Sequence, residues 1–249
     1  MKVIGQSSKT AFFYKKEKND LPDWQLFYKK KCNSTEFKLN DYLKGKDKLT
    51  TPVAIISKEQ TAGFGQHKRN WISPKGGIWL SAAYPIYSSE FLIDVFSLSI
   101  ACKFCELLPP NSDSRSLKLK WPNDILYGSK KLIGFLPKVV TRGEKVLYVR
   151  IGIGFNLNNK TPDEGIALSK VLKKKSLSEH YWTSKILTGI GQAIKSNHQR
   201  EKIISEANTY IDKQHLPRGY RNKNFQIKDI DSFGNLRLLS KNQIKVIRI

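Results

Sequence analysis

The sequence predicts an α+β protein, with one large domain of strands and helices followed by a small all-β unit. Apolar or alternating runs are interleaved with segments whose apolar residues recur at helical spacing. In the middle of the chain, turn residues separate consecutive strand-like runs, as in a meander. The last stretch of about thirty residues contains only short strand patterns, which are too few to fold alone.

The predicted strands are rich in β-branched, aromatic and leucine side chains. WQLFYKK alternates, whereas TPVAIISKEQ and IWLSAAYP are mostly apolar, as expected of buried strands. Gly128-Ser129, Arg142-Gly143 and Gly234-Asn235 supply turn centres between neighbouring strands. Single strands are predicted at 24–30, 51–60, 78–85, 117–121, 224–231, 233–240 and 242–249, and the runs 124–140 and 144–158 are predicted to form a meander that turns at Gly128-Ser129 and Arg142-Gly143.

Helices are predicted at three places. NSTEFKLNDYLKG resembles a capped helix, with Ser34 or Thr35 at its N-cap and Gly45 at its exit. The longest helical pattern covers 90–108, and further helical patterns fall within 183–213. Cys102 and Cys105 form a CxxC inside the longest pattern, but no second Cys/His pair follows, so we interpret them as buried thiols. The predicted domains are an irregular lead-in at 1–23, a main domain at 24–215 and a small C-terminal β domain at 216–249.

The net charge of +23 comes from 44 Lys and Arg against 21 Asp and Glu, and only nine of the basic residues are Arg. A diffuse lysine excess fits a solvated basic surface better than a dedicated reader of DNA, which relies on arginine forks. The most apolar stretch, 91–108, contains Asp94, Lys103 and Glu106, so no membrane span is predicted. Because the N-terminus lacks the apolar core of a secretory signal, we expect a cytoplasmic protein.

The loop EQTAGFGQHKRNW combines two glycines with a run of hydrogen-bond donors, which is typical of a site for an anion such as phosphate. It is not a P-loop, because no G-x-x-x-x-G-K-[ST] is present. It lacks the third glycine of the Rossmann fingerprint, as does GIGFNLN, and the chain has neither the H-R-D nor the D-F-G of a kinase. A nucleotide site here requires another fold.

Three segments resemble the biotin–protein ligase family in their order and approximate spacing: EQTAGFGQHKRNWISPKGG, KWPNDILYGSKKLIG and GIGFNLN. NSTE and PDEGIALSKVL resemble two further segments of that family, so the resemblance covers roughly 24–249. It implies a mixed sheet flanked by helices, like the catalytic domain of class II aminoacyl-tRNA synthetases, with a small C-terminal SH3-like β-barrel. The domain at 24–215 would then be catalytic.

The resemblance also implies a reaction in two steps. Biotin and ATP, with Mg²⁺, give biotinyl-5′-AMP and pyrophosphate; a lysine of the biotin carboxyl carrier domain of acetyl-CoA carboxylase then takes the biotin. Fixed donors suit the first step, since negative charge grows on the α-phosphate and a carboxylate has no proton to lose. A catalytic triad is therefore not expected.

The resemblance assigns roles to three overlapping sets of residues. Those expected to bind biotin are Ser34, Thr35, Gln60, Gly63, Gly65, Lys131, Gly134, Gly152 and Gly154. Those expected to bind nucleotide are Gln66, Arg69, Trp71, Asn123 and Asn156. Those expected to be catalytic are Lys131, Arg69 and Asp124, and no metal site built by the protein alone is expected.

Structural alternatives remain for several of these residues. Trp71 also suits a core position, Asn123-Asp124 suits a simple turn after Pro122, and Gly152 and Gly154 suit strand irregularities. His67 is interpreted as a solvated loop residue.

The chain departs from the family pattern at four positions. Phe64 and Gln66 replace arginines, Lys68 replaces a glycine, and Lys138 replaces the usual glutamate. We still expect an active enzyme, in which Phe64 packs apolar surface over biotin. A lipoate or octanoate ligase or transferase of the same fold is the nearest rival. The second rival is a non-enzymatic biotin binder or a biotin-responsive repressor. A repressor would need a DNA-binding domain before the catalytic domain, and only about 23 residues precede the first strand. The oligomeric state stays open.

Overall fold

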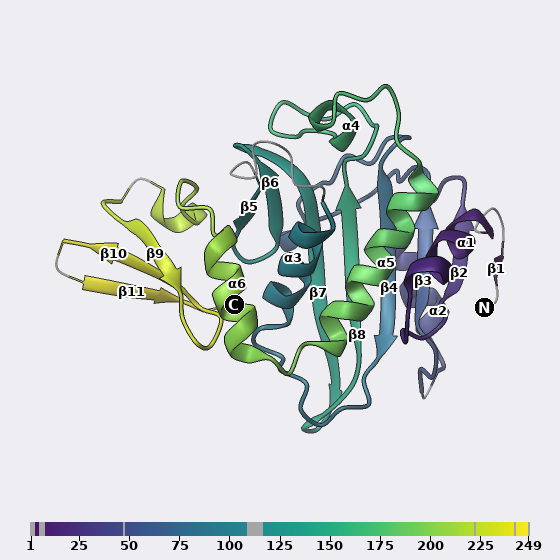
Figure 1. Cartoon of the computed structure of the whole chain (residues 1–249), viewed down its shortest axis with the longest axis horizontal. Helices are drawn as coiled ribbons and strands as arrows, with labels where there is room; N and C mark the ends of the chain where they lie inside the picture. Colours follow the sequence, from purple (N-terminus) through teal and green to yellow (C-terminus); the bar gives the residue numbers. More distant parts are fainter. Residues whose placement is uncertain are drawn as a thin grey trace.

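The structure is a computed structural model that describes residues 3–4, 8–46, 48–108, 117–221, 223–241 and 243–248. Its centre is an eight-stranded mixed sheet with the order β1-β2-β3-β4-β8-β7-β6-β5 (Figure 1). The first three strands run parallel to one another, and all the remaining neighbouring pairs in this sheet are antiparallel. The strands are β1 (Val3–Ile4), β2 (Gln25–Lys29), β3 (Val53–Ser57), β4 (Ile78–Pro85), β5 (Leu117–Lys120), β6 (Asp124–Tyr127), β7 (Lys130–Arg142) and β8 (Lys145–Phe155).

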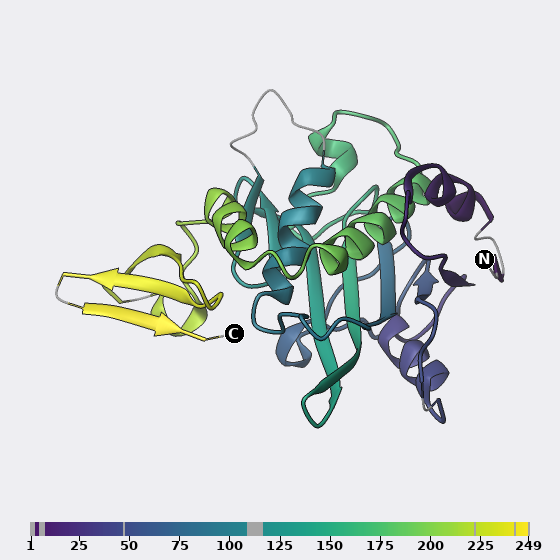
Figure 2. The same ribbon diagram turned by 60° about the horizontal axis from the view of Figure 1, so that its bottom comes forward.

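Helices cover the two faces of this sheet unequally. Helices α3 and α5 lie across one face, and α2 lies on the other (Figures 1 and 2). The α-helices are α1 (Ser8–Glu17), α2 (Thr35–Leu43), α3 (Phe96–Leu107), α4 (Leu168–Val171), α5 (Glu179–Lys195) and α6 (Arg200–Tyr210). Among the described residues no helix has the length and apolar character needed to cross a membrane.

The alternation along β8 assigns its side chains to the two faces. Ile151, Ile153 and Phe155 are at most 4% exposed and belong to the main core with α3 and α5. Successive residues of a strand point to opposite faces, so Gly152 and Gly154 face the side of α2. A second, smaller core packs α2 onto that same side. The repeated isoleucine-glycine pattern therefore supplies a packed core on one face and open space on the other.

The predicted interpretation of Cys102 and Cys105 is confirmed. Both thiols are buried on α3, at 1% and 3% exposure. Burial raises the pKa of Cys102 to about 12 and also raises that of Cys105, so both are neutral at physiological pH. In the described part of the chain no group of three or more His, Cys, Asp or Glu could hold a metal ion.

Two predictions about helices were wrong. The lead-in at 1–23 contains α1, which packs against α5: Thr10 bonds His180, and the ring of Phe13 meets that of Tyr181 edge-on. Its sequence is mostly polar, so tertiary packing rather than pattern decides that it is helical. The helix predicted from residue 90 begins only at Phe96, because Asn197 bonds the backbone N–H and C=O of Leu92. Residues 1–2 and 5–7 of the lead-in lie outside the described residues.

The predicted C-terminal β unit is a three-stranded antiparallel sheet with the order β11-β10-β9. Its strands are β9 (Gln226–Ile230), β10 (Leu236–Ser240) and β11 (Gln243–Ile247), preceded by the 3₁₀ helix η3 (Arg218–Tyr220). Gly234 forms the predicted turn with φ 83°, and its carbonyl accepts a hydrogen bond of 2.9 Å from the indole of Trp121. That bond ties the unit to the main domain. Asn242 and Ile249, the ends of the last predicted strand, lie outside the described residues.

Candidate active site

A pocket of about 410 Å³ lies on the glycine-bearing face of the sheet. Strands β7 and β8 form its floor, and its walls are the start of α2, the loop around η1 (Gln66–Lys68) and the start of β6. The structure brings almost all the predicted site residues to this pocket. Those that line it are Ser34, Thr35, Gln60, Gly65, Gln66, Arg69, Trp71, Asn123, Asp124, Lys131, Gly134, Gly152, Gly154 and Asn156.

Two glycines of the floor make room for one indole ring. Gly134 and Gly154 are direct neighbours across β7 and β8. A Cβ atom on Gly154 would lie 2.6 Å from Nε1 of Trp71, and one on Gly134 would lie 2.8 Å from its Cζ3. Such approaches are shorter than van der Waals contact, so any side chain at either position would displace the ring. Trp71 is thus part of the pocket wall, and its ring lies flat against a bare part of the sheet.

Lys131 meets Asp124 beside that ring. Its Nζ lies 2.7 Å from Oδ1 of Asp124 and 4.5 Å from the centroid of the Trp71 ring. The backbone of Lys131 is fixed by its N–H, which donates to Glu164 at 2.7 Å. Its carbonyl accepts a bond of 3.1 Å from the amide of Asn156. An ammonium group held this way is a point charge aimed into the pocket.

A chain of uncharged polar groups lies at the other end of the pocket. The backbone N–H and the hydroxyl of Thr35 both donate to Oε1 of Gln60, at 2.8 and 3.0 Å. The Thr35 hydroxyl also lies 2.8 Å from that of Ser81, while Nε2 of Gln60 donates to Ser73. Ser34 is the N-cap of α2, as predicted, and its Oγ accepts from the next residue but one. This end can therefore offer hydrogen bonds to a polar ligand group.

The loop that follows β3 forms part of the pocket wall. Gly63 does not line the pocket; its carbonyl accepts from the N–H of Trp71, and a Cβ there would lie 2.6 Å from Oγ of Ser73. Its glycine identity therefore lets the two arms of the loop approach closely. Phe64 is in the wall, with its ring centroid 5.4 Å from that of Phe37.

The tip of this loop is exposed and has unusual backbone angles. His67 and Lys68 have φ values of 55° and 57°, a region that residues other than glycine seldom adopt. His67 is solvent-exposed, as predicted. Arg69 lies at the mouth of the pocket, where its Nε donates to the carbonyl of Gln66 at 3.3 Å.

Two asparagines of the predicted site hold the backbone around it. The Asn123 amide donates to the carbonyl of Phe135 at 2.6 Å, which ties the start of β6 to β7. The Asn156 amide supports Lys131, and its oxygen accepts from Asn159 at 3.0 Å. Asn123 is therefore more than a turn residue, and Asn156 orients the lysine; contact of either with nucleotide stays a prediction.

Sequence reasoning missed several residues of the wall, notably Glu36 and Ser81. Ser81 is the cross-strand partner of Gly152, a relation that only the register of β4 and β8 reveals. Glu36 stands next to the Ser-Thr pair, in the segment NSTE, and forms an ion pair of 3.0 Å with Arg150. The sequence signal that could have identified Glu36 as a pocket residue is its position directly after Ser34 and Thr35.

The model of the Biotin/lipoate A/B protein ligase family matches residues 31–156, half of the chain and most of the strands that build the pocket. The chain belongs to the biotin/lipoate A/B protein ligase family.

The curated relatives that the chain matches are named as ligases. The chain is 33% identical over 118 residues to the bifunctional ligase/repressor BirA of Bacillus subtilis, covering 44% of this chain and 35% of the relative. It is 30% identical over 129 residues to the biotin–[acetyl-CoA-carboxylase] ligase of Paracoccus denitrificans, covering 47% and 49%. The match thus spans between a third and a half of the length of these relatives.

Solved structures confirm the predicted fold class. The biotin protein ligase from Aquifex aeolicus in complex with biotin and ATP superposes with a TM-score of 0.70 at 22% identity, covering 90% of this chain and 95% of that one. The ligase from Leishmania major in complex with biotinyl-5-AMP gives a TM-score of 0.59 at 21% identity, covering 90% and 98%. At these identities the likeness concerns the fold: a mixed sheet flanked by helices with a C-terminal sheet.

Proposed function

We propose that this chain is an ATP-dependent biotin–protein ligase, which makes biotinyl-5′-AMP and transfers the biotin to a lysine of a biotin carboxyl carrier domain. The observation that carries the proposal is the polarity of the pocket. An uncharged hydrogen-bonding group, Thr35 with Gln60 and Ser81, lies at one end, and the ammonium of Lys131 lies at the other.

The uncharged and the cationic end of the pocket match the two ends of biotin. Gly152 marks the first end and Gly154 the second, and two residues of a strand span about 7 Å. Biotin has an uncharged cyclic urea at one end and a carboxylate on an aliphatic chain at the other. The urea suits Thr35 and Gln60, while Lys131 attracts the carboxylate. The name of the Paracoccus denitrificans relative, a biotin–[acetyl-CoA-carboxylase] ligase, supports the same ligand.

The first step follows from the place of Lys131. A carboxylate oxygen of biotin attacks the α-phosphorus of ATP, the bond to the β-phosphate oxygen breaks, and pyrophosphate leaves. Lys131 brings the two anions together and stabilises the charge that grows on the α-phosphate oxygens. Arg69 at the mouth of the pocket supplies a second cation for the phosphates.

The second step needs a nucleophile from outside the chain. The amine of the carrier lysine attacks the acyl carbon, the bond to AMP breaks, and an amide forms with loss of a proton from nitrogen. The carboxylate of Asp124, whose Oδ1 lies 2.7 Å from Nζ of Lys131, would attract the incoming amine. The indole of Trp71 keeps this end of the pocket shielded from water on one side.

Magnesium would enter with ATP rather than occupy a site built by protein alone. Mg²⁺ typically keeps several waters and takes one or two carboxylates together with substrate phosphates. Asp124, on the pocket wall, fits that role and would hold the ion near Lys131. The ion would neutralise part of the phosphate charge.

Mass spectrometry of the carrier tests the proposal. The chain is incubated with biotin, MgATP and a carrier domain, and the intact carrier is weighed. We expect one biotinyl group per carrier, only when ATP is present, and none on a carrier whose acceptor lysine is arginine. Modification with lipoate or octanoate in place of biotin would contradict the proposal and establish the sister activity of the family. Binding of biotin without release of pyrophosphate would instead indicate a non-enzymatic binder.

A further inference from the structure

The C-terminal sheet has two faces of opposite character. Leu236 and Leu238 of β10 are at most 1% exposed, and they pack into the main core. The next side chain along the strand, Leu239, is 43% exposed, and on β11 Ile244 and Val246 are 50% and 43% exposed. Leu239 and Ile244 are direct neighbours in the register, and Val246 lies on the same face, since successive side chains alternate. The face turned away from the main core is therefore an apolar surface open to solvent.

The two edges of this sheet also differ. The edge formed by β9 is covered by α6: the side-chain amide of Asn208 donates to the carbonyl of Ile230 at 2.9 Å, and its oxygen accepts from the N–H of the same residue at 2.8 Å. Strand β11 forms the other edge, and no strand of the described residues pairs with its outer side. The backbone groups on that side are a template on which another extended chain can add as a further strand.

The charge of this unit is almost entirely positive. Residues 216–249 contain eight Lys or Arg and two acidic residues, Asp229 and Asp231. Asp229 is paired with Arg237, whose Nη2 lies 2.6 Å from Oδ2 of the carboxylate. Asp231 accepts three hydrogen bonds within its own turn. Both carboxylates are thus engaged, whereas Lys245 of β11 is exposed, so a chain that adds to this edge meets a basic surface.

Charge and side-chain type decide which kind of chain fits this edge. A second copy is disfavoured, because two β11 strands would bring like charges at Lys245 together. Nucleic acid is disfavoured, because bases stack on aromatic rings and the exposed side chains of this face are aliphatic. A protein segment fits when its side chains alternate. Apolar ones then lie beside Ile244 and Val246, and acidic ones lie beside Lys245 on the opposite face.

We propose that β11 and the apolar face beside it bind an acidic protein segment, which adds to the sheet as a fourth strand. The segment is extended and alternates acidic with apolar side chains. Its backbone pairs with the free edge, its apolar side chains contact Ile244 and Val246, and its carboxylates meet Lys245. None of these three residues lines the pocket, so the inference goes beyond the proposed function and does not depend on it.

Binding of a labelled peptide to the full chain tests the inference by fluorescence anisotropy. The peptide alternates glutamate and valine over seven residues. We expect saturable binding that slows amide exchange at 243–247 and that weakens as salt rises. Two control peptides should bind at least about 10-fold more weakly. One has the same glutamates and valines sorted into two blocks and so lacks the alternation; the other has every amide N-methylated and so lacks the backbone donors.

Two variants of β11 are compared with two matched variants of α1. Val246→Asp and Lys245→Glu should each weaken peptide binding at least about 10-fold, because each places a carboxylate against the acidic segment. Phe12→Asp and Lys15→Glu replace an exposed apolar and an exposed basic residue of α1 and should leave binding unchanged. An unchanged melting temperature verifies that each variant folds.

Several results would overturn the inference. The alternating peptide does not bind, its N-methylated form binds equally well, or the four variants behave alike. A different occupant would be indicated if Val246→Asp instead abolished binding of oligothymidylate, binding to vesicles that contain phosphatidylserine, or self-association of the chain in sedimentation. Release of pyrophosphate plays no part in these measurements, so the proposed function is judged separately.

Discussion

Gly134 and Gly154 face each other across β7 and β8, and the indole of Trp71 occupies the space their side chains would need. Beside that ring, Lys131 is held by hydrogen bonds of its backbone to Glu164, Ile166 and Asn156 and by one ion pair. A lysine is flexible when free, and these contacts limit the positions that its ammonium can reach. At the residue scale, the chemistry we propose depends on that preorganised charge.

Replacement of this lysine tests the assignment. Lys131→Ala should slow biotin-dependent release of pyrophosphate by about 10²-fold or more, as for loss of one preorganised donor. Lys130→Ala is the matched control, since Lys130 is exposed on the same strand and should leave the rate unchanged. A near wild-type rate for Lys131→Ala would show that another residue supplies the charge.

At the element scale, the strands were more predictable than the helices. Strand β4 has the predicted bounds 78–85, and the turns of the meander at Gly128 and Gly143 are where the sequence indicates them. These features follow from local patterns. Helix α1 does not, because its polar sequence becomes helical only through contact with α5.

The site residues that could be predicted from the sequence are those that lie within recognisable sequence motifs. Lys131, Asp124 and Trp71 belong to recognised segments and do meet in one pocket. Ser81 belongs to no motif, since only strand register brings it beside Gly152. The ion pair of Glu36 with Arg150 joins residues 114 positions apart, a distance that no local pattern spans.

The loop around η1 should change its mobility when ligands bind. Gly63 and Gly65 flank Phe64, and the next residues carry exposed donors and unusual φ angles. We expect biotin with ATP to protect residues 63–70 from amide exchange more than biotin alone does, because the phosphates engage Arg69. Helix α1 serves as an internal reference that should not change. Equal protection with and without ligands would make the loop a static turn.

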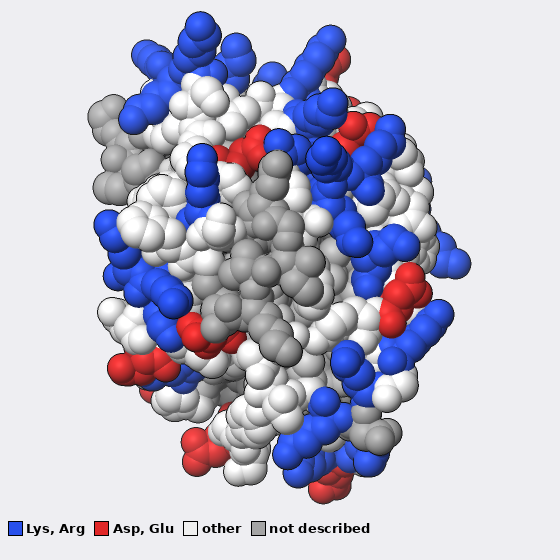
Figure 3. All heavy atoms as spheres, turned by 90° about the vertical axis from the view of Figure 1, so that its right-hand side faces the viewer, with Lys and Arg blue, Asp and Glu red and all other residues white. Residues whose placement is uncertain are grey.

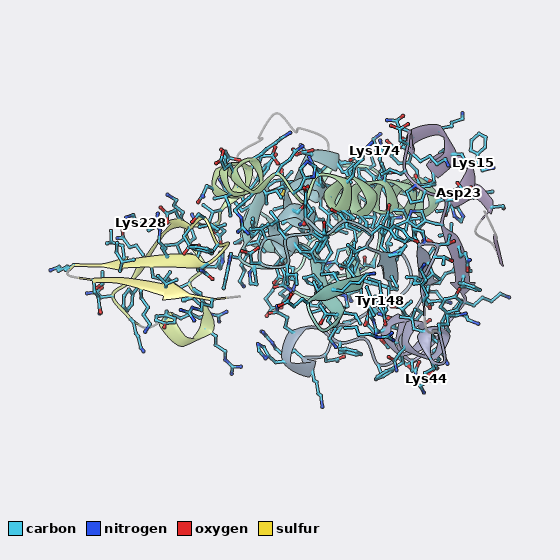
Figure 4. All side chains as sticks on the ribbon, turned by 90° about the horizontal axis from the view of Figure 1, so that it is seen from below. Lys15, Asp23, Lys44, Tyr148, Lys174 and Lys228 are labelled. Atoms are coloured by element: carbon cyan, nitrogen blue, oxygen red, sulfur yellow. The ribbon has the colours of Figure 1, made fainter. Side chains whose placement is uncertain are left out.

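At the scale of the whole molecule, the dominant property is charge. The face that carries β1 and β2 shows many Lys and Arg side chains and few acidic ones (Figure 3). Individual lysines point outward at separate places on the molecule, as Lys15, Lys44, Lys174 and Lys228 do (Figure 4). A net charge of +23 spread in this way raises the rate of encounter with an acidic partner without requiring specific contacts.

The salt dependence of the two reaction steps shows whether the surface charge acts in adenylate formation or in biotin transfer. Transfer of biotin to an acidic carrier should slow several-fold as salt rises from about 50 to about 300 mM, because screening weakens long-range attraction. Release of pyrophosphate should change far less, since its charges meet inside the pocket. If both steps respond equally to salt, the charge is a general surface property without a role in partner choice.

We propose that the pocket formed around Lys131 and Thr35 activates biotin by letting its carboxylate attack the α-phosphorus of ATP. Biotin labelled with ¹⁸O in both carboxylate oxygens tests this most directly, with AMP and pyrophosphate analysed by mass spectrometry after transfer to a carrier. Because the attacking oxygen stays on phosphorus when the amide forms, we predict one ¹⁸O in each AMP and none in pyrophosphate. Label in pyrophosphate or inorganic phosphate, or unlabelled AMP alongside a biotinylated carrier, would contradict the account.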